Sequence, residues 1–150
     1  ANVQTNSGNR GFNLFTKYSK LNYLSIDEPE ARLGLSEKNL NIMNLVKDKR
    51  LKKYKNLMIT RGIDGLIVKI NDKKDKNIIK FPALNIKVVD TLGAGDAVYS
   101  YTSCLVKTNC DPRLLALVGA IAGGLKTNIL GHSNWVSLKQ VERSLEAILK

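Results

Sequence analysis

Apolar and polar residues follow two different spacings along the chain, and these predict a mixture of strands and helices. Short runs rich in Ile, Leu and Val predict strands at 21–26, 56–62, 65–70 and 78–84, with the polar segment 71–77 as a hairpin loop. Apolar residues at helical spacing predict helices at 7–20, 28–35, 36–54, 94–107, 111–127 and 137–150. Because strands alternate with helices, we expect an α/β fold with a mainly parallel sheet.

Capping residues support several of these helices. Ser36 and Ser137 precede amphipathic segments and are typical N-caps. Asp111 is also a typical N-cap, and Pro112 after it supports a helix start because proline is favoured in the first helical turn.

The size and composition fit one globular domain. The chain has 150 residues, 43% of them hydrophobic, which is enough for a packed core. No apolar run approaches the roughly 20 residues of a membrane helix. The polar start of the chain has no signal-peptide core. We therefore expect a cytoplasmic protein with no membrane partner.

The cysteine and histidine residues do not form a metal-binding pattern. Cys104 and Cys110 have the wrong spacing for a Cys-x-x-Cys pair, and His132 is the single histidine. We expect two free thiols in a reducing compartment.

The formal net charge of +11 allows two interpretations. The positive residues are mostly lysines spread along the chain, with one dense patch at 47–55. This patch is either a solvated helix face or a nucleic-acid surface. Aromatic residues are not interleaved in it, which favours the solvated face and argues against nucleic acid. The basic excess also suits an anionic substrate such as a nucleotide or a sugar phosphate.

A glycine motif at 88–101, "VVDTLGAGDAVYSY", carries the candidate chemistry. Gly93 and Gly95 permit unusual backbone angles and let a ligand approach the main chain. The helix that follows begins with N–H groups that bind phosphate or a developing negative charge. Asp96, in its first turn, could take a proton from an attacking hydroxyl. Taken alone, the Gly-x-Gly spacing favours a simpler interpretation, a turn followed by a helix-start charge.

The whole string Asp-Thr-x-Gly-Ala-Gly-Asp at 90–96 is more specific, and it resembles the second signature of the ribokinase/PfkB family of carbohydrate kinases. The resemblance implies a ribokinase-like, Rossmann-like three-layer α/β/α fold and phosphoryl transfer from ATP, with Mg²⁺, to a sugar or sugar-phosphate hydroxyl. It implies that Gly93, Ala94 and Gly95 form the anion hole. It also implies that Asp96 is the base that contacts the substrate, and that Asp90 lies near the phosphates and metal.

Two earlier segments resemble further motifs of this family. "SIDEPEARL" resembles its Asn-x-x-Glu motif, with Asp27 in place of Asn and Glu30 as the Glu, and the resemblance implies that both help to hold magnesium. Helix capping is the alternative role for this pair. "TRGIDG" resembles the nucleotide-side Thr-x-Gly-x-x-Gly turn, which implies nucleotide contacts by Thr60, Gly62 and Gly65.

The segment "AIAGGLKTNILGH" resembles the family's helix and loop that close over the adenine. Gly131 matches the loop glycine and so implies a nucleotide contact. Ala120 stands where Asn or His is frequent, which implies that one polar contact to adenine is missing. His132 is interpreted as a loop residue rather than a catalyst.

The resemblance runs from about residue 20 to the end and covers the C-terminal half of a family member. Residues 1–150 are therefore expected to be the nucleotide-binding part of a single kinase domain, inactive alone and compatible with a homodimer. "NSGNRGFNLFTKY" and "YLSIDEPEARL" are similar to kinases related to the bacterial heptose-phosphate kinase of ADP-heptose synthesis. A non-catalytic nucleotide-binding or regulatory module of the same fold, and a basic nucleic-acid-binding domain, remain as alternatives. The intact Asp96 argues against the non-catalytic module.

Overall fold

The computed structural model describes residues 1–3, 5, 8, 11–70, 78–84 and 88–150, and the predicted loop at 71–77 lies outside them. Its strands are β1 (Tyr23–Asp27), β2 (Asn56–Thr60), β3 (Leu66–Ile70) and β4 (Ile78–Phe81). Its α-helices are α1 (Glu28–Leu35), α2 (Ile42–Val46), α3 (Lys49–Lys52), α4 (Ala94–Lys107), α5 (Pro112–Thr127) and α6 (Leu138–Leu149). Two short 3₁₀ helices are η1 (Phe15–Lys17) and η2 (Gly62–Asp64).

The sheet has the strand order β1-β2-β3-β4, and the prediction of a mainly parallel sheet is wrong for the strands described. Only β1 and β2 run parallel, while β3 is antiparallel to β2 and β4 is antiparallel to β3. The reason is that the short turn through η2 reverses the chain, because a parallel strand would need a longer crossover. The parallel pair ends at Asp27 and Thr60, which are partners in register.

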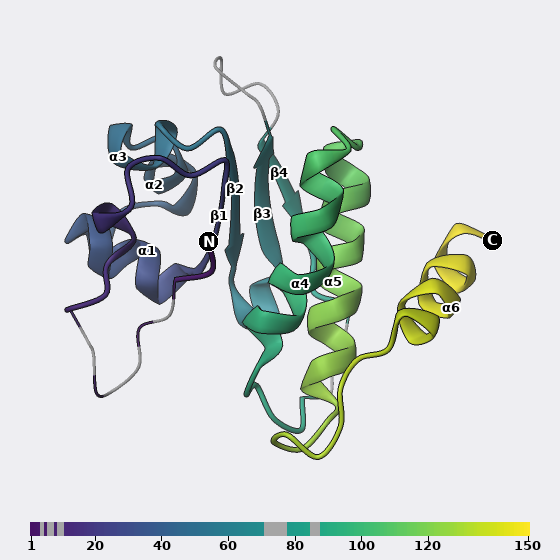
Figure 1. Cartoon of the computed structure of the whole chain (residues 1–150). Helices are drawn as coiled ribbons and strands as arrows, with labels where there is room; N and C mark the ends of the chain where they lie inside the picture. The colour runs from purple at the N-terminus through teal and green to yellow at the C-terminus, as the bar shows by residue number, and fades with distance from the viewer. Residues whose placement is uncertain (4, 6–7, 9–10, 71–77, 85–87) are drawn as a thin grey trace.

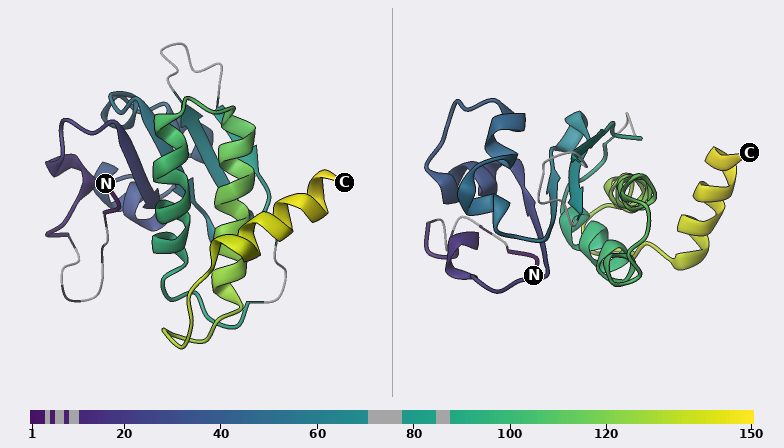
Figure 2. Two further views of the ribbon diagram at one scale, coloured as in Figure 1. Left: turned by 45° about the vertical axis from the view of Figure 1, so that its right-hand side comes forward. Right: turned by 90° about the horizontal axis from the view of Figure 1, so that it is seen from above.

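The chain forms the three layers expected for this fold (Figure 1, Figure 2). The helices α1 to α3 lie on one face of the sheet, and α4 and α5 lie on the other. Side chains along β2 alternate between these layers. Leu57 and Ile59 pack toward α1–α3, whereas Met58 packs with residues of α4 and α5. Both faces of the sheet are therefore buried.

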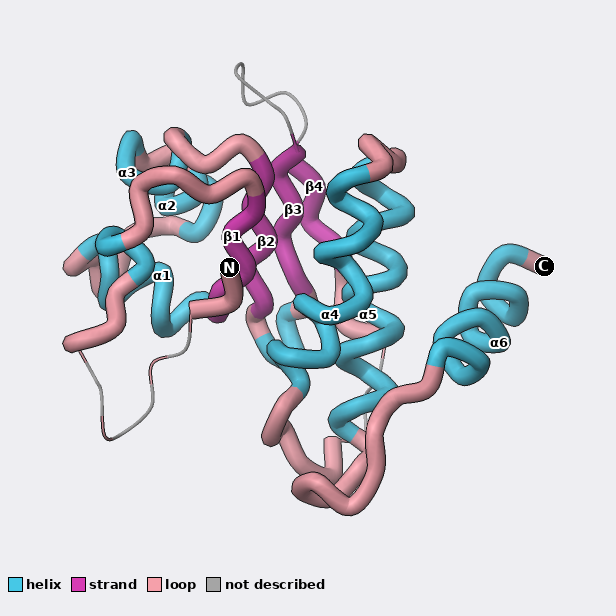
Figure 3. Tube along the Cα trace, in the orientation of Figure 1, coloured by secondary structure: helices cyan, strands magenta, loops and turns pink. Residues whose placement is uncertain are grey.

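Two predicted helices are not formed as expected. In the described part of 7–20, only η1 is helical. The predicted helix at 36–54 is two short helices, α2 and α3, separated by a turn (Figure 3). Ser36 is the C-cap of α1, with a left-handed φ of 54°, rather than an N-cap. The Arg32 guanidinium donates to the carbonyls of Lys38 and Leu40 and holds this segment away from a helical path.

The last three helices confirm the sequence prediction. Asp111 caps α5 by accepting from Arg113 N, and Ser137 caps α6 by accepting from Gln140 N. Packing against α5 fixes one end of α6, whose Val141 is buried with Leu117 and Ile121. In the portion of the chain that the structure describes, no helix is both long and apolar enough to cross a membrane.

Candidate active site

A pocket of about 450 Å³ lies at the carboxyl ends of the parallel strands β1 and β2. Open α/β sheets commonly bind ligands at this edge. Its described lining comes from the end of β1, the β2–β3 turn, the segment after β4, the start of α4 and the face of α5. These residues are Asp27, Thr60, Gly62, Ile63, Gly65, Leu66, Ala83, Leu84, Val88, Thr91, Ala94, Gly95, Val98, Gly119, Ala120, Gly123, Gly124 and Thr127. The structure therefore joins the Thr-x-Gly-x-x-Gly turn to the glycine motif.

The β2–β3 turn needs its two glycines for different reasons. Gly62 and Gly65 both have positive φ angles, of 56° and 80°. A Cβ on Gly65 would lie 2.0 Å from the carbonyl oxygen of Phe81, so no side chain fits there. A Cβ on Gly62 would meet nothing within 4 Å. Gly65 thus closes the turn onto β4, and Gly62 leaves open space beside the pocket.

The start of α4 forms the opposite wall. Gly93 is its N-cap in a left-handed conformation, with φ of 76°, and no side chain caps the helix. Ala94 and Gly95 line the pocket, and a Cβ on Gly95 would meet no atom within 4 Å. Because the first N–H groups of a helix lack partners within it, this wall is suited to bind an anion. One of these groups, Ala94 N, donates to the carbonyl oxygen of Thr91 at 3.1 Å, just before the helix.

Asp96 follows this wall directly, with an exposed side chain. Its Oδ1 accepts a hydrogen bond of 2.7 Å from the Asn2 side-chain amide. The Asp96 charge is also one of the causes that raise the pKa of Glu30, so the two carboxylates lie within electrostatic reach of each other. The predicted base therefore follows the glycine wall directly in the chain and lies within electrostatic reach of Glu30.

Asn2 contacts the predicted base, and the sequence analysis missed it. Its segment runs alongside β1, with an isolated parallel bridge between Asn2 and Ser25 and a hydrogen bond from Ser25 N to Ala1 O. Asn2 and Asp96 are 94 positions apart, so no local pattern could connect them. The fold brings Asn2 to the carboxylate because this segment lies beside the first strand.

Asp27 and Glu30 form a reciprocal capping box at the start of α1. Asp27 Oδ1 accepts from Glu30 N at 2.7 Å, and Glu30 Oε2 accepts from Asp27 N at 2.9 Å. Glu30 Oε1 also accepts from Thr5 N at 2.7 Å. Burial raises the pKa of both carboxyls above their ordinary values. The pair thus fulfils the capping role, and it also presents carboxylate oxygens at the edge of the sheet.

The raised pKa of Glu30 has a measurable consequence for stability. An acid whose pKa is raised on folding stabilises the fold below its unfolded pKa, near 4.5, and loses that contribution as pH rises through the folded pKa. We expect wild-type stability, relative to Glu30→Gln, to decline as pH rises from 4.5. Urea unfolding of both proteins across this range measures the difference. If the wild type instead gains stability relative to Glu30→Gln as pH rises, the pKa of Glu30 is not raised in the folded protein.

Asp90 and Gly131 contact each other, and neither is among the described residues that line the pocket. Asp90 Oδ1 accepts from Leu92 N at 2.9 Å, and its Oδ2 accepts from Gly131 N at 2.7 Å. These two N–H groups, first Leu92 and then Gly131, lower the pKa of Asp90. Among the described lining residues of the pocket, Gly131 is absent. The predicted contacts of Asp90 with metal and of Gly131 with nucleotide remain predictions.

The described residues contain no group of three or more His, Cys, Asp and Glu side chains that could hold a metal ion. Of the three predicted metal ligands, Asp27 and Glu30 are joined by hydrogen bonds, whereas Asp90 is bonded to Leu92 and Gly131. His132 is exposed in the loop after α5, as expected, and Ala120 lies in the pocket wall. The sequence analysis also missed Gly123 and Gly124, although two adjacent glycines in an apolar helix signal a close approach by another group.

The chain resembles known proteins both in sequence and in structure. A sequence model of the "pfkB family carbohydrate kinase" matches residues 15–123. No curated protein matches the chain.

Solved structures resemble the chain at low identity. Phosphofructokinase-2 from Escherichia coli in complex with potassium has a TM-score of 0.75 at 14% identity. The match covers 90% of this chain and 43% of the phosphofructokinase chain. Ribokinase from Arabidopsis thaliana complexed with ribose and ATP has a TM-score of 0.70 at 21% identity, covering 85% and 42%. A nucleoside kinase from Burkholderia thailandensis in complex with inosine has a TM-score of 0.64 at 20% identity, covering 84% and 39%. The chain has the fold of these proteins and spans less than half of their length.

Proposed function

The chain belongs to the pfkB family of carbohydrate kinases, and from that premise we propose that residues 1–150 are the C-terminal, nucleotide-binding part of an ATP-dependent sugar or sugar-phosphate kinase. One observation carries the proposal. A single pocket is lined both by the β2–β3 turn and by the uncapped start of α4, and the exposed carboxylate of Asp96 follows that start directly.

The size of the pocket suits a nucleotide. Its volume of about 450 Å³ lies within the common range of small-molecule sites. The open space at Gly62 and Gly95 lets a ligand reach the main chain on both walls. The bound nucleotide supplies the transferred phosphoryl group. Thr60, Gly62 and Gly65 would contact it on one side, and the α4 start would hold its phosphates.

Asp27 and Glu30 are the residues that would hold magnesium. Mg²⁺ prefers oxygen ligands and is usually bound by one or two carboxylates together with substrate phosphates, so a larger protein cluster is not required. We leave Asp90 out of this set because it does not line the pocket, whereas Asp27 does and Glu30 is hydrogen-bonded to Asp27.

In the reaction, Asp96 accepts the proton of the acceptor hydroxyl as that oxygen attacks the phosphoryl group. Asn2 donates to Oδ1 of Asp96 and so restrains the rotation of the carboxylate. The main-chain N–H groups of Gly93 and Gly95 would stabilise the negative charge that builds on the transferred group, and that of Ala94 would join them by giving up its hydrogen bond to the carbonyl of Thr91. We place the protein in the cytoplasm, where the free thiols of Cys104 and Cys110 stay reduced.

The acceptor class is tested with the full-length protein. Ribose, fructose 6-phosphate, inosine and heptose phosphates are incubated with labelled ATP and Mg²⁺, and phosphorylated products are separated. We expect a product from a sugar or a sugar phosphate. If the protein binds ATP but phosphorylates no member of such a panel, the non-catalytic module is the better account.

Nucleotide binding by the 150-residue chain is a separate prediction. Because no sugar contributes to the site, we expect Mg-ATP to bind weakly, with Kd on the order of 10⁻⁴–10⁻³ M. Calorimetry measures it, with Gly95→Leu as the blocking variant, because that side chain would occupy the open space at the pocket wall. A folded sample that gives no heat at millimolar Mg-ATP, or a Gly95→Leu chain that binds as well as wild type, would refute the proposed site.

A further inference from the structure

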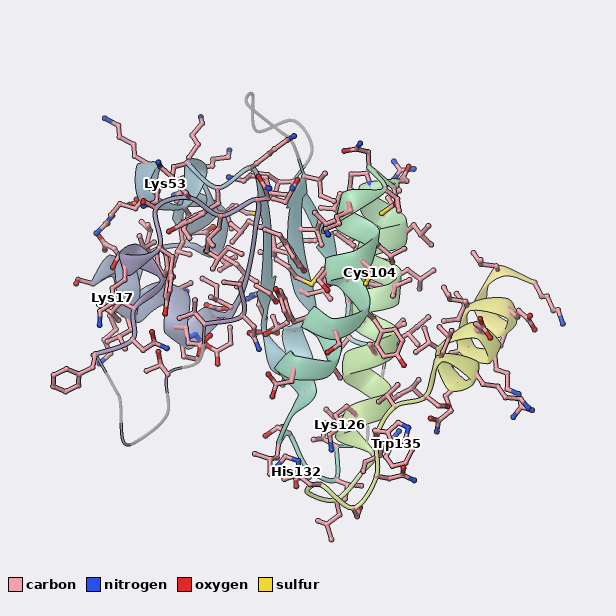
Figure 4. The ribbon with its side chains drawn as sticks, in the orientation of Figure 1. Lys17, Lys53, Cys104, Lys126, His132 and Trp135 are labelled. Atoms are coloured by element: carbon pink, nitrogen blue, oxygen red, sulfur yellow. The ribbon has the colours of Figure 1, made fainter. Side chains whose placement is uncertain are left out.

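Lys126 is a buried cation at the end of the apolar helix α5. Its side chain is only 6% exposed. Figure 4 shows the Lys126 side chain. Its Nζ donates a hydrogen bond of 2.5 Å to the carbonyl oxygen of Gly131. A charge is costly to bury, so a lysine is kept at such a place only where it is paired and hydrogen-bonded. The exposed lysines of the chain, such as Lys53, carry no such constraint.

Both main-chain groups of Gly131 are hydrogen-bonded to side chains. Its carbonyl accepts from Lys126, and its N–H donates to Asp90. The backbone N–H groups of Val89 and Asp90 in turn donate to the carbonyl of Thr127. The loop after α5 is thereby fastened to the segment that leads into the glycine motif.

Lys126 also lies directly against the glycine turn. Its Cε would be 3.1 Å from a Cβ placed on Gly93, the residue whose left-handed conformation starts α4. Lys126 and Asp90 interact electrostatically, which helps to lower the pKa of Asp90. The ammonium group therefore adds a fixed positive charge close to the helix start that we assign to phosphate.

We propose that Lys126 is a positioning residue of the anion hole, which holds the Gly93 turn in place and supports negative charge there with its own. The proposal rests on the proposed kinase function, because it gives a role to the same helix start. It assigns Asp90 and Gly131 to the same support. A fixed positive charge near a developing negative charge in a partly screened site raises the reaction rate roughly ten- to fiftyfold.

Three variants of the full-length protein separate the charge from the loop contacts. Lys126→Met keeps the apolar stem and removes the charge, Lys126→Arg keeps the charge, and Asp90→Asn weakens the contact to Gly131 while leaving the ammonium. Lys139→Met on the exposed side of α6 is the control. We expect kcat to fall roughly ten- to fiftyfold in Lys126→Met, less in Asp90→Asn, with partial recovery in Lys126→Arg and no change in the control.

Two results would overturn the proposal: a normal kcat in a folded Lys126→Met protein, or equal losses in Lys126→Met and Asp90→Asn. The first result would show that Lys126 has no role in catalysis. The second would show that Lys126 only holds the loop and that its charge adds nothing. If wild-type protein transfers no phosphate to any acceptor, the proposed function fails, and the affinity for inorganic phosphate then tests Lys126 by itself. We expect Lys126→Met to bind phosphate severalfold more weakly than wild type and Lys139→Met, whereas equal affinities would refute the inference.

Discussion

Replacement of Asp96 by asparagine should lower kcat of the full-length protein by about 10²–10⁴-fold and leave the affinity for Mg-ATP nearly unchanged. Asparagine has the size of aspartate, and its oxygen still accepts the hydrogen bond from Asn2. The glycine turn and the start of α4 are therefore preserved. Only the group that accepts the proton is lost. Steady-state kinetics and ATP calorimetry on the same preparations measure the two quantities.

The alternative role for Asp96 is a helix-start charge, and it makes a different prediction. Loss of such a charge costs about 0.3–1 kcal/mol of stability and little activity. Glu146→Gln, at an exposed position of α6, is a matched control that removes one carboxylate far from the glycine motif along the chain. An Asp96→Asn protein with near-normal kcat and a lowered melting temperature would show that the residue is structural.

Gly65→Ala should destabilise the fold by roughly 3 kcal/mol or more, because two separate costs fall on one residue. Its φ of 80° and ψ of −131° belong to a region that essentially only glycine adopts. The new Cβ would also lie 2.0 Å from the carbonyl oxygen of Phe81, a backbone atom that cannot rotate away. The turn would have to separate from β4. Urea unfolding followed by circular dichroism measures the loss.

Gly62→Ala is the matched control for this prediction. Gly62 has a φ of 56° in the same turn, but a Cβ there meets nothing within 4 Å. Left-handed backbone alone costs an alanine about 1–2 kcal/mol, so this variant should remain mostly folded. Equal losses in the two variants would mean that the contact with β4 contributes nothing.

The elements that the sequence predicted well are those with complete local signals. The helices α5 and α6 each have a capping residue and a continuous apolar pattern, and both form as predicted. The segment 36–54 has a similar apolar pattern, but Asn41 and Asp48 inside it cap the new helices α2 and α3. Periodicity alone predicts one helix in this segment, but the two capping residues divide it into two helices. The direction of β3 relative to β2 was missed for a related reason, since a short turn after β2 determines it. The antiparallel pairing of β3 and β4 agrees with the hairpin that the sequence predicted.

The candidate site likewise contains some residues that local sequence patterns predict and others that they do not. The glycines of the β2–β3 turn and of the α4 start are recognisable because their spacing is local, and the fold brings both to one pocket. Asn2 and Lys126 give no local signal, because each acts on a residue far away in the sequence. Gly131 resembles a nucleotide contact by motif, yet its N–H and carbonyl are bonded to Asp90 and Lys126. Only the three-dimensional arrangement reveals these partners.

The position of the nucleotide is the central claim, and a crystal structure of the full-length protein with Mg²⁺ and a non-hydrolysable ATP analogue tests it most directly. We predict the base and ribose between the β2–β3 turn and α5, and the terminal phosphate at the N–H groups of Gly93–Gly95, with Asp96 beside it. A nucleotide bound elsewhere, such as at the basic segment 47–55, with the pocket left unfilled, would contradict the account.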